Sequence, residues 1–240
     1  ARILFMPRAI SEVIITAPYW VSYPEMVKMV YGVPVIVHSE DGRFQPRLQD
    51  IKAAVSTYTK AIILNSPNNP SGAVYSDDFV AELVDFCETK GIYLITDDIY
   101  HKLIFDGRSF APAYRYSKKD VEESKIIVIN GVSKLYAMTG FRIGWTVAPK
   151  KIVEVMINVQ AQTTSCPSTV SQVASVGALT GVQSGIESLR FTLQNNRNIM
   201  IQELKALDGV HITQPGGTFY CLPDFRAYNK SSVDLCHFLL

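Results

Sequence analysis

Residues 61–100 read AIILNSPNNPSGAVYSDDFVAELVDFCETKGIYLITDDIY, and this stretch contains the clearest structural pattern in the chain. Two short apolar runs, Ala61–Asn65 and Ile92–Thr96, flank a segment whose apolar residues recur with helical spacing. Ser76 can cap the start of that helix, and Gly91 can end it. The pattern predicts a strand, a crossover helix and a second strand parallel to the first.

The same alternation continues on both sides of this unit. Short runs rich in β-branched residues predict four more strands, at Glu12–Thr16, Val33–His38, Lys125–Asn130 and Gly144–Ala148. Apolar strands that alternate with helical segments are typical of a mostly parallel sheet with crossover helices. The sequence therefore predicts an α/β fold.

After Pro149 the pattern changes to long helical stretches. Three helices are expected, at Lys151–Gln162, Ser168–Thr180 and Ser184–Leu207. Residues 210–222 then predict two short strands around a Pro-Gly-Gly turn, and Val233–Leu240 has an apolar helical pattern. We expect a large domain at residues 1–182 and the start of a smaller C-terminal domain at residues 183–240.

Length and charge exclude several classes of function. The chain has 240 residues, enough for a large domain with a sizeable core. Its 23 Lys and Arg nearly balance its 22 Asp and Glu, so nothing predicts binding to nucleic acid or to an anionic membrane. No apolar run is long enough to span a bilayer, and no signal-peptide pattern is found. We expect a soluble, cytoplasmic protein.

The cysteines and histidines do not predict a metal site. The four cysteines are widely spaced and form no Cys-x-x-Cys pair, which argues against a zinc site and a redox motif. We expect buried, reduced thiols at Cys87, Cys166, Cys221 and Cys236. The four histidines are expected to be satisfied or exposed, with no role in the chemistry.

Polar residues follow several predicted strands at their carboxyl ends. One strand runs into the turn-rich Asn65–Gly72, the next into Asp97–Tyr100, and a third into Gly131–Lys134, while Trp20 follows the first strand. Taken alone, such an asparagine forms a turn, such an acid caps a helix or binds a metal, and such a lysine lies on the surface. Because ligands bind at the carboxyl ends of strands in open α/β sheets, the combination predicts an enzyme-like crevice.

Four segments resemble, in order and spacing, the class I aminotransferases of the aspartate aminotransferase fold. They are APYWVSYP at residues 17–24, NSPNNPSG at 65–72, DDIY at 97–100 and SKLYAMTGFRIG at 133–144. The likeness is greatest to bacterial-type aspartate and prephenate aminotransferases and extends from about Glu12 to the end of the chain. It implies a mostly parallel sheet with helices on both faces, part of a smaller α+β domain, and pyridoxal 5′-phosphate as cofactor.

The resemblance implies catalytic roles for Lys134, Asp97 and Tyr100. Lys134 matches the lysine that holds the cofactor as a Schiff base and later moves a proton between substrate and cofactor. Asp97 matches the carboxylate that faces the pyridine nitrogen and keeps it protonated, so that the ring can act as an electron sink. Tyr100 and Asn69 match the two residues that hydrogen-bond the phenolic oxygen of the cofactor and stabilise its negative charge.

Three further residues complete the cofactor site that the resemblance implies. Arg142 matches the arginine that binds the cofactor phosphate, for which a planar guanidinium is suited. Ser133 can add a hydroxyl to that phosphate, although Gly131 stands where some relatives have a serine. Trp20 matches the aromatic residue over the cofactor ring and, with Asn69, is expected to bind substrate. The alternative for Trp20 is a role in core packing.

We assign no chemical role to the neighbours of these residues. Asp98 is expected to serve only local structure. Packing or interface roles are expected for four tyrosines, Tyr19, Tyr23, Tyr75 and Tyr136.

The resemblance also indicates that this chain is shorter than members of the family. An absent N-terminal part would carry the loop and helix N-terminus that cradle the cofactor phosphate, and a tyrosine that reaches across the dimer. A segment after Leu240 would carry the arginine for the substrate α-carboxylate. We therefore assign the function to the intact enzyme and expect little activity from this truncated stretch alone.

The function that the resemblance implies is ping-pong transamination between aspartate or glutamate and a 2-oxo acid, carried out by a homodimer. Within the same fold, the alternatives are a prephenate or aromatic aminotransferase and a pyridoxal-phosphate lyase. An alternative of another class is a truncated, catalytically inactive protein that binds the cofactor or a partner. A nucleotide-binding enzyme is disfavoured, because the chain has neither Gly-x-Gly-x-x-Gly after its first strand nor a Walker A sequence.

Overall fold

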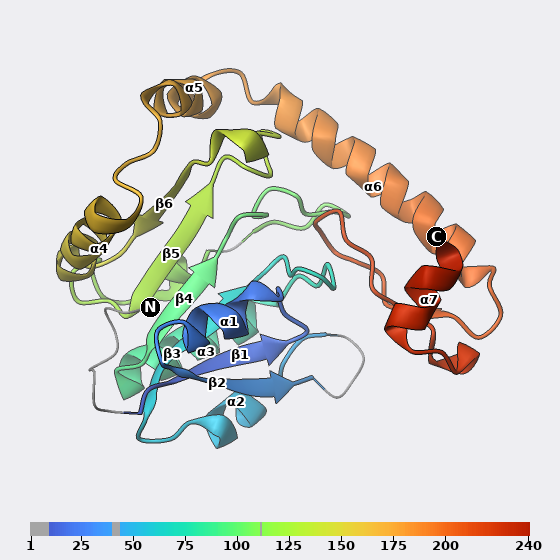
Figure 1. The fold of residues 1–240 in the computed structure, drawn as a ribbon, viewed down its shortest axis with the longest axis horizontal. Helices are drawn as coiled ribbons and strands as arrows, with labels where there is room; N and C mark the ends of the chain where they lie inside the picture. Colours follow the sequence, from blue (N-terminus) through green and yellow to red (C-terminus); the bar gives the residue numbers. More distant parts are fainter. Residues whose placement is uncertain (1–9, 40–43, 111) are drawn as a thin grey trace.

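The computed structural model describes residues 10–39, 44–110 and 112–240. Within them, one sheet has the strand order β2-β1-β3-β4-β5-β6 (Figure 1). Its strands are β1 Glu12–Ala17, β2 Val33–His38, β3 Thr59–Asn65, β4 Tyr93–Asp97, β5 Ile126–Gly131 and β6 Gly144–Val147. Strands β1 to β5 pair in parallel, and β6 runs antiparallel to β5. The prediction of a mostly parallel α/β sheet is confirmed.

The helix predicted between β3 and β4 is α3, Asp77–Lys90. Its first turn is capped by the Ser76 hydroxyl, which accepts from the Phe79 amide at 3.3 Å, and Gly91 ends it in the left-handed conformation at φ 70°. The apolar side of α3 packs with Ile14, Ile62 and Leu94 of the sheet in the largest buried cluster. The helix therefore covers one face of the sheet.

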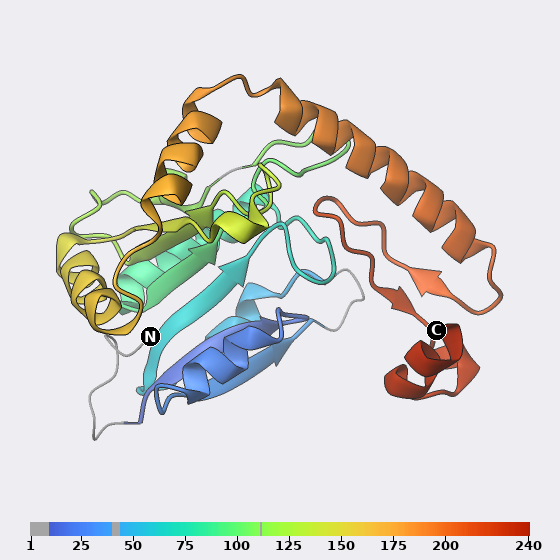
Figure 2. The same ribbon diagram turned by 45° about the horizontal axis from the view of Figure 1, so that its top comes forward.

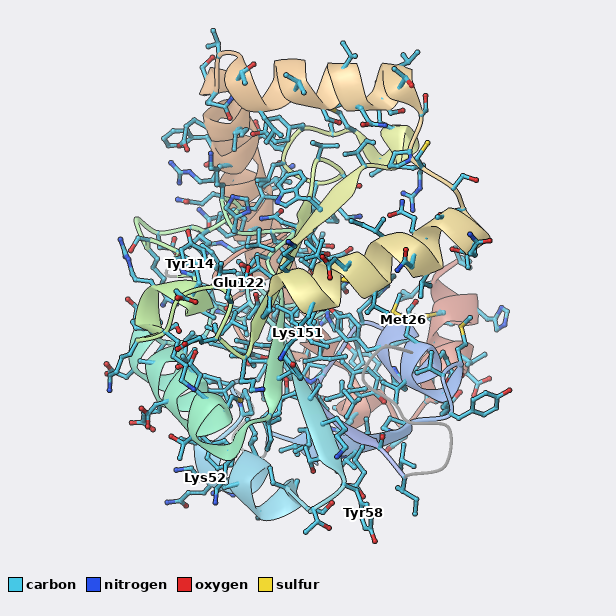
Figure 3. All side chains as sticks on the ribbon, turned by 90° about the vertical axis from the view of Figure 1, so that its left-hand side faces the viewer. Met26, Lys52, Tyr58, Tyr114, Glu122 and Lys151 are labelled. Atoms are coloured by element: carbon cyan, nitrogen blue, oxygen red, sulfur yellow. The ribbon has the colours of Figure 1, made fainter. Side chains whose placement is uncertain are left out.

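The opposite face is covered by α1, Ser22–Lys28, and α4, Lys150–Thr163. The strand side chains that point away from α3 pack on this face. Val13 and Ile15 pack against α1, and Ile127 packs against α4. Because neighbouring strand residues point to opposite faces, this split confirms that helices lie on both faces of the sheet. Figure 3 labels Met26 on the outer side of α1 and Lys151 at the start of α4.

Two short helices were not expected from the sequence. They are α1 and α2, Leu48–Ala54, each of seven residues. Fewer than two full turns leave too few apolar positions for a helical period to show. Each helix is held against the rest of the molecule by a few buried side chains, which are Tyr23, Pro24 and Val27 in α1 and Ile51 in α2.

Beyond the sheet, the chain forms α5, Thr169–Thr180, and the long α6, Ser184–Lys205, as predicted. Figure 2 shows α6 leading from the sheet toward the segment with β7, His211–Ile212, β8, Pro223–Asp224, and α7, Ser232–Leu239. The two predicted strands are only two residues long, and β8 lies beyond the expected range. Short 3-10 helices occur at Ala113–Tyr116, Thr139–Phe141 and Arg226–Tyr228. The predicted domain boundary stays a prediction, and its residues 1–9 lie outside the described residues.

Several predictions about surface and cysteines can be compared with the structure. Cys87 is buried as expected and Cys221 is half-buried, but Cys166 and Cys236 are exposed, so the expectation of buried thiols was wrong for these two. In the described part of the chain no group of His, Cys, Asp and Glu could hold a metal ion. No helix in that part has both the length and the apolar character needed to cross a membrane.

An ion pair between the buried Arg197 and the partly exposed Asp106 fastens α6 to the rest of the molecule. The Arg197 guanidinium donates to both carboxylate oxygens of Asp106 at 2.7 and 2.6 Å, and also to the Pro215 carbonyl at 2.9 Å. Arg197 is only 7% exposed and lies 4.9 Å from the centre of the Phe105 ring. Hydrogen bonds from Arg197 hold the pKa of Asp106 below its ordinary value. One side chain therefore joins α6, the loop after β4 and the turn before Gly216.

We expect Arg197→Met to lower the free energy of unfolding by about 1–2 kcal/mol at pH 7, since partial exposure of Asp106 screens the pair. The pair stabilises the fold only while Asp106 is ionised. That contribution is therefore present above the carboxyl's unfolded pKa of about 3.9 and disappears as the pH falls through its lowered folded value. Urea unfolding of both proteins at pH 7 and pH 3 measures this.

The matched control is Arg190→Met, seven positions earlier on α6. Arg190 forms an ion pair with Glu187 at 2.9 Å, and the Glu187 side chain is exposed. This change should cost less than about 0.5 kcal/mol. Equal losses for the two variants would contradict the role given to Arg197.

Candidate active site

A cavity of about 530 Å³ lies at the carboxyl edge of the sheet. Its wall includes each of the site residues predicted from the sequence, Trp20, Asn69, Asp97, Tyr100, Ser133, Lys134 and Arg142. Asp97 is the last residue of β4, and the others come after β1, β3, β4 and β5 in the chain. The structure thus places an aromatic ring, an amide, a carboxylate, hydroxyls, an amine and a guanidinium around one space, within the range typical of small-molecule sites.

The loop after β3 shows which of its asparagines serve the backbone. The side-chain amide of Asn65 donates to the backbone carbonyl of Asp97 at 2.9 Å. Its side-chain oxygen accepts from the backbone N–H of Asn69 at 2.8 Å. Asn68 accepts from both the backbone and the hydroxyl of Ser71, at 3.1 and 2.6 Å. The turn-forming role therefore belongs to Asn65 and Asn68, while the Asn69 side chain lines the cavity.

The Asp97 carboxylate is largely buried, and a tyrosine supports it. The Tyr23 hydroxyl donates to Asp97 Oδ2 at 2.6 Å, and the Ile99 amide donates to Oδ1 at 3.3 Å. Burial raises the pKa of Asp97 above its ordinary value, while Tyr23, the Ile99 amide and the Lys134 ammonium each oppose that rise. These three groups favour the ionised carboxylate in a site that otherwise disfavours charge.

The expectation that Tyr23 serves packing covers only part of its contacts. Tyr23 is buried among Val13, Ile15 and Val27, and its ring lies 5.5 Å from that of Trp20 at 88°. Its hydroxyl nevertheless points at Asp97. No local pattern in the sequence predicts this bond, because the two residues are 74 positions apart.

Two aromatic residues from the far end of the chain also approach the site. Lys134 Nζ lies 5.8 Å from the centre of the Phe219 ring. The Tyr220 hydroxyl lies 3.1 Å from the Tyr100 hydroxyl, a contact between residues 120 positions apart. No local pattern in the sequence pointed to either aromatic residue. Only the folded arrangement of the segment after α6 brings them to the cavity.

The two residues predicted to bind the cofactor phosphate, Arg142 and Ser133, both line the cavity. Arg142 is exposed, has a left-handed backbone with φ 56°, and donates from Nη1 to the Thr139 carbonyl at 3.0 Å. Ser133 is half-buried beside it in the cavity wall. A Cβ at Gly131 would lie 2.7 Å from the Ile143 carbonyl oxygen. Glycine at this position therefore has a structural reason, because a serine here requires the β5–β6 connection to shift.

Comparison with known proteins gives a consistent family. The family model described as aminotransferase class I and II matches residues 2–239. The aspartate aminotransferase of Geobacillus stearothermophilus is 37% identical over 217 residues, which are 90% of this chain and 55% of that protein. The aspartate/prephenate aminotransferase of Thermus thermophilus is 38% identical over 219 residues, 89% of this chain and 55% of that protein.

A solved structure shows the same arrangement. The crystal structure of the aspartate aminotransferase from Rhizobium meliloti matches with a TM-score of 0.87 at 35% identity, covering 92% of this chain and 55% of that one. The chain thus spans little more than half the length of these relatives.

We expect Tyr23→Phe to raise the pKa of Asp97 by roughly one unit, because a charge-assisted hydrogen bond to the ionised form is lost. Carbon-13 NMR of the aspartate carboxyl groups measures this, with Asp97→Asn to assign the signal. Tyr19→Phe removes a hydroxyl from a partly buried neighbour that packs on the same cluster and should leave the titration unchanged. An unaltered Asp97 titration in Tyr23→Phe would show that the bond does not support the carboxylate.

Proposed function

This chain belongs to the class I and II aminotransferase family, and on that premise we propose that the whole protein transfers amino groups between an amino acid and a 2-oxo acid with pyridoxal 5′-phosphate as cofactor. The observation that carries the proposal is the convergence of Lys134, Asp97 and Arg142 on one cavity. An amine, an acid and a guanidinium in one site match the aldehyde, the pyridine nitrogen and the phosphate of that cofactor. The matched relatives are named aminotransferases, which favours transamination over the lyase and inactive alternatives.

The donor set of the cavity fits this cofactor. Trp20 is 38% exposed and has ring surface available for stacking on an aromatic ligand. Each carboxylate oxygen of Asp97 has two acceptor positions, so the bonds from Tyr23 and the Ile99 amide leave capacity for a ring N–H. The guanidinium of Arg142 has five N–H donors, more than its bond to the Thr139 carbonyl uses.

Each residue then has a defined task. When bound, the cofactor supplies an electron sink for the bonds at the substrate α-carbon. Asp97 holds the proton on the ring nitrogen, and Lys134 Nζ takes up the proton that leaves the α-carbon. Tyr100 and Asn69 donate hydrogen bonds to the phenolic oxygen of the cofactor, while Arg142 and Ser133 bind its phosphate.

For the amino donor, we propose aspartate or glutamate, following the name shared by the relatives from Geobacillus and Rhizobium. Trp20 and Asn69 are the residues of this chain that we assign to substrate binding, because both line the cavity beside Asp97. Prephenate is the second candidate acceptor, since the Thermus relative is named for both activities. Parallel assays with aspartate, glutamate and prephenate distinguish them.

We also propose a homodimer in the cytoplasm. The first part is supported by the apolar side chains that α5 leaves in solvent, among them Val170, Val173 and Val176, at 75%, 67% and 60% exposure. Their spacing of three places them along one side of the helix, and a contiguous exposed apolar surface of this kind is typical of an interface. Sedimentation of the purified protein measures the oligomeric state.

We expect Lys134→Ala to abolish covalent attachment of the cofactor and to lower transamination at least roughly 10²-fold. Borohydride reduction followed by peptide mass spectrometry measures the attachment, which in the parent should fall on the peptide containing Lys134. Lys150→Ala, a change to an exposed lysine at the start of α4, is the matched control and should behave as the parent does. A cofactor fixed at another lysine would refute this assignment.

We expect Asp97→Asn to retain the cofactor but to lose turnover by orders of magnitude, because a neutral amide cannot hold the proton on the ring nitrogen. Single-turnover kinetics with aspartate measures the loss, and visible absorbance reports cofactor content. Asp98→Asn is the matched control, since Asp98 is the buried neighbour that does not line the cavity, and burial raises its pKa to about 7. Similar rates for both variants would remove Asp97 from the chemistry.

A further inference from the structure

Tyr220 holds an unusual place in the cavity wall. Among the described residues that line the cavity, it alone comes from the chain beyond α6. Its hydroxyl lies 3.1 Å from the hydroxyl of Tyr100, and the two rings meet edge to face, with centroids 5.9 Å apart at 84°. The Phe219 ring also meets that of Tyr100 edge to face, with centroids 5.6 Å apart. The Tyr100 ring and hydroxyl are therefore both in contact with this later segment.

The backbone around Tyr220 is fixed independently of its hydroxyl. The Tyr220 amide donates to the Thr218 hydroxyl at 3.1 Å, and the Thr218 amide donates to the Leu103 carbonyl at 2.8 Å. The Gly217 amide donates to the Gly72 carbonyl at 3.0 Å. A Cβ at Gly217 would lie 2.5 Å from the Leu103 carbonyl oxygen, so the segment approaches as closely as glycine allows. Loss of the Tyr220 hydroxyl alone should leave these contacts in place.

The hydrogen count of the pair gives it a direction. A tyrosine hydroxyl has one hydrogen to donate and two lone pairs with which to accept. Burial raises the pKa of Tyr100, so its hydroxyl keeps its proton. If Tyr100 gives that proton to the cofactor, its oxygen can only accept from Tyr220. Accepting a hydrogen bond polarises a hydroxyl and makes it a stronger donor in turn.

We propose that Tyr220 is a positioning residue, whose hydroxyl donates to Tyr100 and thereby directs the Tyr100 hydrogen toward the phenolic oxygen of the cofactor. This inference rests on the proposed function, because it requires pyridoxal 5′-phosphate in the cavity. It adds a residue from the segment after α6 to a site otherwise built from the strand ends. Position and strength of the Tyr100 hydrogen bond then depend on how that segment lies.

The test is the pH titration of the visible absorbance of the bound cofactor. Donors to the phenolic oxygen stabilise its negative charge and lower the apparent pKa of this titration. Tyr220→Phe should therefore raise that apparent pKa by roughly 0.3 to 1 unit, whereas Tyr100→Phe should raise it further. In the double variant, Tyr220→Phe should add nothing, because the hydroxyl through which it acts is already missing.

Tyr228→Phe is the matched control, since Tyr228 follows in the same segment but packs on Phe225, 5.8 Å away, and is not part of the cavity wall. It should titrate as the parent does. An unchanged titration in Tyr220→Phe, or an equal shift with and without the Tyr100 hydroxyl, would overturn the inference. A lowered apparent pKa would also overturn it, by showing that Tyr100 donates to Tyr220 instead. A parent protein without any visible cofactor band would refute the proposed function itself.

Discussion

The parallel register of β3, β4 and β5 brings Asn65, Asp97 and Ile129 to the same level of the sheet. Parallel strands must all leave the sheet at one edge, so the polar loops that follow them meet there whatever their separation in the chain. The antiparallel pairing of Gly131 with Gly144 then returns the chain past the same edge and adds the Arg142 side. The acid, the amine and the guanidinium of the candidate site depend on this pairing, since a shift in register would separate the acid from the amine.

Burial of Asp97 at that edge makes its negative charge unfavourable, and the surrounding residues offset part of this cost. Removal from water disfavours the charge of Asp97, and a hydroxyl, a backbone amide and a nearby ammonium together oppose the effect. The hydroxyl comes from α1, on a different strand connection from the ammonium of Lys134. Tyr23 and Tyr220 come from opposite ends of the chain, and each places its hydroxyl against another residue of the cavity wall, Asp97 and Tyr100 respectively.

Local patterns were sufficient for the elements with strong periodicity or end signals. The strands and α3 could be predicted because β-branched runs, the Ser76 cap and Gly91 act within a few residues. Placing Lys134 and Asp97 in one site rested on the resemblance and on the rule for strand ends. The short α1, and the hydroxyls of Tyr23 and Tyr220, could not be found in this way. Their positions result from contacts 74 and 120 residues apart, for which local spacing contains no signal.

The attachment of the segment after α6 bears on what can move in this molecule. Its amides at Gly217 and Thr218 bond to the Gly72 and Leu103 carbonyls, which belong to the loops that follow β3 and β4. The Arg197 ion pair to Asp106 fastens α6 to the second of those loops. Because these loops also carry Asn69 and Tyr100, a displacement of the segment must either pull on the cavity wall or break these hydrogen bonds. The distance between the Tyr100 and Tyr220 hydroxyls therefore depends on the position of the segment after α6.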